Sequence, residues 1–217
     1  MTSRRDFLGL MGAGGLAPVL LPAFADNASL PPLPTSDYDM SWIDRIRTPH
    51  KVVFDAPSVD GGGAVWRSVL LRKEYADAFG TSADDFSTVL VLRHWGVTLA
   101  MQHTFWQKEG IGQATSTKDR QGNWATRNPV GPVPDDGNPA DVPYTIPGVI
   151  AAGTIVLACD LAFNRTVVTK YIADGMSRAE ARQLAVADLI PGVILQPSGY
   201  FATVRAQQAG CVAFFNG

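Results

Sequence analysis

Short, continuous apolar runs alternate along this 217-residue chain with stretches in which apolar residues recur at helical spacing. Five of these runs are predicted to be strands, and they cover residues 51–55, 88–92, 154–158, 193–196 and 211–215. The run over 88–92 has the pattern of a strand buried on both faces. Helices are predicted between the five runs over 64–79, 99–108, 161–173 and 200–209, with Gly80 and Gly210 at two helix ends. The alternation predicts one α/β domain, built on a mostly parallel sheet with helices on both faces.

Two stretches depart from this alternation. Residues 26–49 are rich in proline and predict an extended arm, which Trp42, Ile43 and Ile46 would dock as one helical turn. Residues 110–147 hold many of the Gly, Pro, Asn and Asp residues, and a loop of this length is usually functional or disordered. Ser177 and Glu180 then form a capping-box pattern, which predicts the start of another helix. The domain is therefore expected over 50–217, with an insert at 110–147.

The first 25 residues are predicted to be an export signal. Arg4 and Arg5 precede a short, Gly-rich apolar stretch, and Ala23 and Ala25 supply a small-x-small cleavage pattern. This segment resembles a twin-arginine (Tat) signal peptide cleaved after Ala25, because the apolar stretch is too short and too rich in Gly and Pro for a stable span. The resemblance implies passage through the Tat translocase to the periplasm. No later stretch is long enough to span a membrane, so no stable membrane span is expected after cleavage.

Composition excludes several classes of function. The chain is 46% hydrophobic and 18% charged with a net charge of −2, which excludes a disordered chain. Its isoelectric point near 5.9 gives no general basic footprint, so no nucleic-acid partner is expected. Two cysteines are too few for a disulfide scaffold or a four-thiolate zinc site. The sequence carries neither a nucleotide-binding motif nor a hydrolase nucleophile elbow, and we predict no cofactor.

The two cysteines take different places on the predicted sheet. Cys159 ends the third strand, at the edge where open α/β sheets bind ligands. Cys211 begins the fifth strand, at the opposite edge. In parallel strands of five residues these positions lie about 16 Å apart, which is too far for a disulfide. Cys211 is therefore expected in the core.

Charged residues near Cys159 bear on its reactivity. The helix that follows it, together with Arg165 on that helix and Arg93 and His94 at the end of the second strand, would favour the nucleophilic thiolate. Asp160 would oppose it. Two interpretations stay open from the residues alone: Cys159 is a reactive thiol, or it is an inert core residue.

Three segments of the chain resemble the DsrE/DsrF-like family of sulfur-relay proteins. They are the strand over 51–55, the run 155–159 followed by Arg165, and the closing stretch over 192–210 with its Pro-Ser-Gly and Gln-x-x-Gly motifs. Residues 92–94 and 101–110 resemble an exported branch of that family. The resemblance implies a three-layer α/β/α domain with five strands that assembles as a homo-oligomer, a trimer or hexamer. In sulfur-transferring members a cysteine at the end of the third strand accepts sulfur as a persulfide, and Cys159 matches that position.

The sequence thus leads to the hypothesis of an exported protein that binds or relays a small sulfur species on Cys159. Its partner would be that species or a sulfur-carrier protein. Arg93, His94 and Arg165 would form an anion-binding pocket, which the insert at 110–147 would cover. Two alternatives remain: a non-catalytic periplasmic binding or assembly protein of the same fold, and a metal-binding protein that uses His94, His103 and Cys159.

Overall fold

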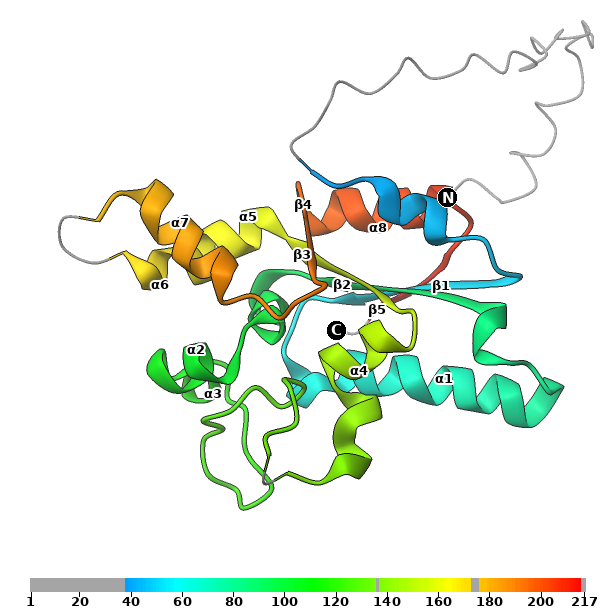
Figure 1. Ribbon diagram of the computed structural model, residues 1–217, viewed down its shortest axis with the longest axis horizontal. Coiled ribbons are helices and arrows are strands. Elements are labelled where there is room, and N and C mark those ends of the chain that lie inside the picture. Colours follow the sequence, from blue (N-terminus) through cyan, green and yellow to red (C-terminus); the bar gives the residue numbers. More distant parts are fainter. Residues whose placement is uncertain (1–37, 136, 173–175, 216–217) are drawn as a thin grey trace, which may run out of the picture. The chain divides into compact units, whose positions relative to one another are not determined.

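A five-stranded sheet, in which every neighbouring pair of strands is parallel, forms the centre of the protein (Figure 1). The computed structural model describes residues 38–135, 137–172 and 176–215, so Arg4, Arg5 and Ala25 of the predicted export signal lie outside the described residues. The strand order is β4-β3-β2-β1-β5. The strands are β1 (His50–Ala56), β2 (Phe86–Leu92), β3 (Ile155–Cys159), β4 (Ile194–Gln196) and β5 (Val212–Phe215).

Helices connect the strands. The α-helices are α1 (Gly63–Phe79), α2 (His103–Lys108), α3 (Ile111–Ala114), α4 (Ile146–Ala151), α5 (Asp160–Ala162), α6 (Thr169–Tyr171), α7 (Arg178–Ala187) and α8 (Gly199–Gln208). The 3₁₀ turns are η1 (Ser41–Arg45), η2 (Asp60–Gly62), η3 (Ala83–Asp85), η4 (His94–Ala100) and η5 (Pro139–Tyr144), and η6 (Phe163–Val168) is π-helical.

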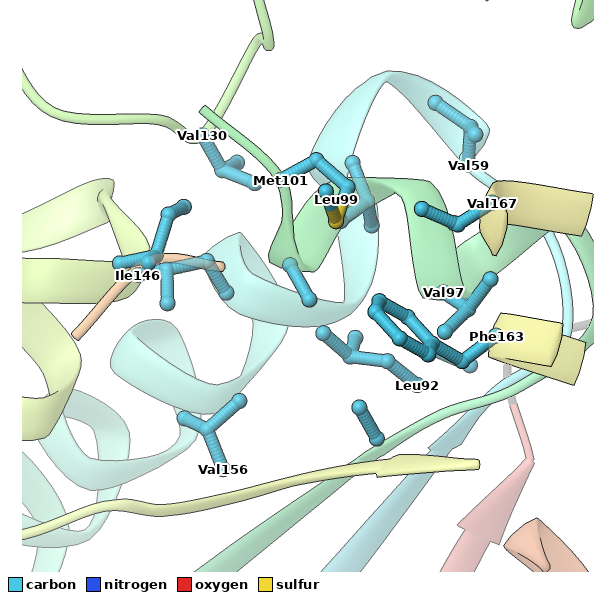
Figure 2. Close-up of a cluster of buried hydrophobic side chains, with 14 of the residues drawn as sticks. Val59, Leu92, Val97, Leu99, Met101, Val130, Ile146, Val156, Phe163 and Val167 are labelled. Carbon is cyan, nitrogen blue, oxygen red and sulfur yellow. The ribbon is translucent and has the colours of Figure 1, made fainter. Parts of the chain in front are cut away.

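Successive residues of a strand point to opposite sides of the sheet. Because β2 and β3 are buried along their whole length, both faces of the sheet are covered there. On one face Phe54, Leu90 and Val156 pack with α1, η4 and η6, in the larger core cluster that Figure 2 shows in part. On the other face Val53 and Leu157 pack with α8 and η1 in a smaller cluster. Figure 1 shows α1 and α4 on one side of the sheet and α8 on the other. This arrangement confirms the predicted three-layer α/β/α fold.

The connections that follow β3 and β4 diverge to opposite faces of the sheet. The chain crosses from β1 to β2 to β3 to β4 in one direction, and then returns past the whole sheet to β5 through α8. The chain leaving β3 therefore packs on one face, and the chain leaving β4 packs on the other. Adjacent parallel strands whose connections diverge in this way leave a ligand crevice beyond their carboxyl ends. Cys159 and its register partner Gln196 lie at that point.

Two predicted helices differ from the structure. Residues 94–100 form the turn η4, which is buried over 96–100, and the following helix starts only at His103. The helix predicted over 161–173 is divided into α5, the π-helical η6 and α6. Side chains account for part of this division, because Asn164 Nδ2 donates to the carbonyl of Asp160 and Thr169 Oγ1 to that of Arg165.

The end of the predicted arm docks as expected. Trp42 is fully buried and Ile46 nearly so, and both belong to the smaller core cluster. The capping box at Ser177 and Glu180 is also present, with both reciprocal hydrogen bonds. Among the described residues, no helix combines the length and the apolarity needed to cross a bilayer.

Candidate functional site

Cys159 is the last residue of β3 and also caps the helix that follows. Its Sγ accepts a hydrogen bond from the Ala162 amide at 3.4 Å. The side chain is 7% exposed and contacts the larger core cluster. Cys159 therefore combines a strand-end position with a sulfur that accepts a hydrogen bond from a helix amide.

Arg93 directly follows β2 and forms an ion pair with Asp55. Its Nε and Nη2 donate to the two carboxylate oxygens of Asp55 at 2.6 and 2.9 Å, and the side chains are 16% and 4% exposed. The hydrogen bond to Asp55 is the main reason why the pKa of Arg93 lies above its ordinary value, with smaller contributions from Tyr200 and Cys159. The Cys159 thiol therefore lies within electrostatic range of a guanidinium whose charge Asp55 largely balances.

The start of α8 closes over Arg93. The guanidinium carbon lies 5.0 Å from the centroid of the Tyr200 ring, a cation–π geometry. A Cβ at Gly199 would come within 2.7 Å of the Arg93 Cβ, so the glycine leaves room for the arginine side chain. The Pro-Ser-Gly motif thus has a packing role: Ser198 caps α8 through the Phe201 amide, and Gly199 lies against Arg93.

Asp160 is paired elsewhere and does not face the sulfur as a free carboxylate. Tyr38 donates its hydroxyl to Asp160 Oδ2 at 2.9 Å, and Arg182 donates to Oδ1 at 2.6 Å. The carboxylate side chain is 11% exposed. The Arg182 guanidinium balances the charge of Asp160 and the Tyr38 phenol adds a hydrogen bond, so this carboxylate is paired within the fold.

A pocket of about 380 Å³ opens beside the helix that Cys159 caps. The lining residues come from η4 and from the chain after β3, and they are His94, Trp95, Ala162, Arg165, Thr166, Thr169 and Lys170. Ala162 joins the two features, because it lines this pocket and its amide donates to Cys159 Sγ. The structure therefore brings His94 and Arg165 together, as predicted, whereas Arg93 is not among the lining residues.

The charge of this pocket is positive. In the described part of the chain, neither the Arg165 guanidinium nor the Lys170 ammonium has a hydrogen-bond or ion-pair partner. The lining contains hydroxyls and an indole but no Asp or Glu. Two cations that have no partner among the described residues, with no carboxylate in the lining, give this pocket the charge that anions require.

His94 lies at the rim in a backbone conformation that non-glycine residues seldom adopt. Its φ is 47°, and its Nε2 lies 3.5 Å from the Tyr200 hydroxyl. Left-handed backbone at a non-glycine residue costs free energy and is found preferentially at functional sites. This strain is a second feature, independent of charge, that marks the pocket.

The insert does not cover this pocket, contrary to the sequence-based expectation. None of the described residues of 110–147 lines it, and they form instead a separate cavity of about 800 Å³ next to His103. His103 is fixed there, with Nε2 at 2.7 Å from the Pro132 carbonyl and Nδ1 accepting from the Asn128 amide. Within the described residues, no three His, Cys, Asp or Glu side chains come together as a metal site requires.

The two cysteines are separated as predicted, and both are free thiols. Cys211 lies just before β5, at the amino-terminal edge of the sheet, and packs in the smaller core cluster. Burial raises the pKa of its thiol to about 11. Cys211 is therefore a core residue.

Sequence reasoning missed several residues of the site. Asp55 carried a usable signal, because a carboxylate inside a buried apolar strand needs a partner. Lys170 and Trp95 stand close in sequence to the predicted Arg165 and His94. Tyr38 had no such signal, since 122 positions separate it from Asp160.

We compared the chain with protein-family models, with curated proteins and with solved structures, and none of them matches it.

Proposed function

We propose that this protein carries sulfur on Cys159, accepting it as a persulfide from a small sulfur species or a sulfur-carrier protein that docks in the adjacent cationic pocket. One observation carries the proposal: Ala162 lines the pocket with Arg165 and Lys170, and its amide donates a hydrogen bond to Cys159 Sγ, so one residue joins the thiol to the pocket. The position at the diverging connections of β3 and β4 supports it, because α/β domains bind ligands there.

The transfer needs no external oxidant. The Cys159 thiolate attacks the outer sulfur of a donor persulfide, and a new S–S bond forms to Sγ while the S–S bond of the donor breaks. The donor leaves as a thiolate with the electron pair and takes up a proton. The Ala162 amide stabilises negative charge on Sγ before the attack, and the Arg165 and Lys170 charges attract an anionic donor.

Mass spectrometry of the alkylated protein tests this proposal. After incubation with a persulfide donor, Cys159 of the wild-type protein should gain the mass of one sulfur atom. Cys159→Ser should lose this modification, and the matched variant Cys211→Ser should retain it, since Cys211 lies in the other core cluster. A Cys159 that is alkylated no faster than Cys211 and never gains sulfur would exclude the relay.

A binding protein without thiol chemistry is the second candidate, and the burial of Cys159 favours it. The thiol is only 7% exposed and packs against the core, although the pocket beside it is open. In that case the pocket would hold an anion and Cys159 would only cap α5. Cys159→Ala would then retain ligand binding, and the wild-type protein would show no sulfur adduct.

A further inference from the structure

The pocket beside Cys159 is far larger than an inorganic sulfur species needs. Its volume of about 380 Å³ lies in the range of sites for organic ligands, which span roughly 300 to 1,000 Å³. A sulfide or thiosulfate ion would leave most of it to water. The size therefore points to an organic molecule.

The lining defines the charge of that molecule. Arg165 and Lys170 present two cations with no partner among the described residues, and Thr166 and Thr169 place hydroxyls beside them. Carboxylates pair with both cations, with Arg bidentately and with Lys as a point charge. Two separate cations favour two separate carboxylates over one compact oxyanion.

The remaining surface suits an aliphatic chain. Trp95 is 44% exposed and lines the same pocket as Arg165, Lys170 and Ala162, so its indole offers an apolar wall there. The Ala162 amide donates a hydrogen bond to Cys159 Sγ. A ligand with carboxylates on Arg165 and Lys170 and its chain on Trp95 occupies the pocket that Ala162, the neighbour of Cys159 Sγ, also lines.

We infer that the pocket binds a low-molecular-weight thiol that bears two carboxylates, a cysteine-containing peptide, and that the persulfide of this thiol is the donor to Cys159. The donor role rests on the proposed function, whereas the binding does not. The step is the persulfide transfer already described. The released peptide thiol keeps its two carboxylates on Arg165 and Lys170 until it dissociates.

Binding is measured first, without thiol exchange. The probe is S-methylglutathione, a tripeptide with two carboxylates and a blocked sulfur, titrated by calorimetry into the Cys159→Ala protein. We expect binding that weakens about fivefold when either Arg165→Gln or Lys170→Gln is added, as for the loss of one partly solvated charge contact. The diethyl ester of the probe should bind more weakly. Lys73→Gln, an exposed lysine on α1 outside the lining, is the matched control and should change nothing.

Several results would overturn the inference. They are the absence of binding at millimolar probe, equal binding by all variants, and thiosulfate binding as tightly as the tripeptide. A wild-type protein that takes sulfur only from a protein-bound persulfide, and not from glutathione persulfide, would exclude the donor role of the peptide but not its binding. These results are distinct from failure of the relay: binding to Cys159→Ala without any sulfur adduct on wild-type Cys159 leaves the pocket assignment intact and removes only the donor role.

Discussion

The two thiols of this protein differ in what the surrounding residues do to each sulfur. The Sγ of Cys159 accepts a hydrogen bond from the Ala162 amide and lies within electrostatic range of the Arg93 guanidinium. Cys211 instead packs with the apolar side chains of the smaller core cluster. Sequence position predicted this difference, because the two cysteines occupy opposite ends of parallel strands. It did not predict that Asp55 pairs with Arg93 or that Tyr38 donates to Asp160, because in both pairs the two residues are remote in sequence.

Cys211 should react with alkylating reagents only at high pH. Burial raises the pKa of its thiol from the ordinary value of 9.0 to about 11, partly offset by the charge of Lys51. In a Cys159→Ser background, the rate of iodoacetamide labelling of native Cys211 should rise with a midpoint near pH 11, and that of the urea-unfolded protein near pH 9.

The same shift makes stability depend on pH. The native state keeps the Cys211 proton between pH 9 and 11 while the unfolded chain releases it, so this contribution is complete below pH 9 and is lost as pH rises through 11. Urea titrations of Cys159→Ser and of the Cys159→Ser/Cys211→Ala double variant measure it. If the difference in unfolding free energy between them stays constant from pH 8 to pH 11, the shift is not real.

At the scale of elements, the sequence predicted the strands and the long helices well. The five apolar runs correspond to β1 to β5, and α1 and α8 lie where the apolar spacing put them. The turns η4 and η6 were missed for different reasons: side chains bond to carbonyls within η6 and its flanks, whereas a contact outside the local sequence decides η4. Gly96 packs against the backbone of Ala56, where a Cβ would collide, and so holds η4 against the end of β1.

The docked turn η1 should be a main support of the smaller core cluster. Trp42 is fully buried there, so Trp42→Ala should lower the free energy of unfolding by about 3 to 5 kcal/mol, the usual cost of such a truncation. Because Cys211 belongs to the same cluster, its labelling should accelerate more than that of Cys159.

Urea unfolding and mass spectrometry of the labelled protein measure these two effects. The matched control is Trp66→Ala, since Trp66 is 51% exposed on α1 and its loss should change stability by no more than about 0.5 kcal/mol. Equal losses in the two variants would contradict the assignment of η1 as a structural element of the core.

At the scale of the whole molecule, the fold class followed from the order of elements, but the shape of the site did not. Alternating strands and helices predict a parallel sheet, and a parallel sheet places Cys159, Arg93 and His94 at one edge. Sequence could not show that the insert forms its own cavity or that Arg93 is bound to Asp55, since both depend on packing between distant segments.

Export is the remaining prediction at this scale. The paired Arg4 and Arg5 and the pattern ending at Ala25 predict translocation of the folded chain by the Tat pathway and a mature protein that begins at Asp26. In a Gram-negative host, the wild-type chain should therefore be recovered from the periplasm with that amino terminus, as determined by mass spectrometry.

Arg4→Lys/Arg5→Lys should leave the protein uncleaved in the cytoplasm, because the twin-arginine motif is what the translocase recognises. Arg45→Lys/Arg47→Lys, a pair beyond the signal, is the matched control and should be exported normally. Periplasmic, processed protein from the Arg4→Lys/Arg5→Lys variant would refute the assignment.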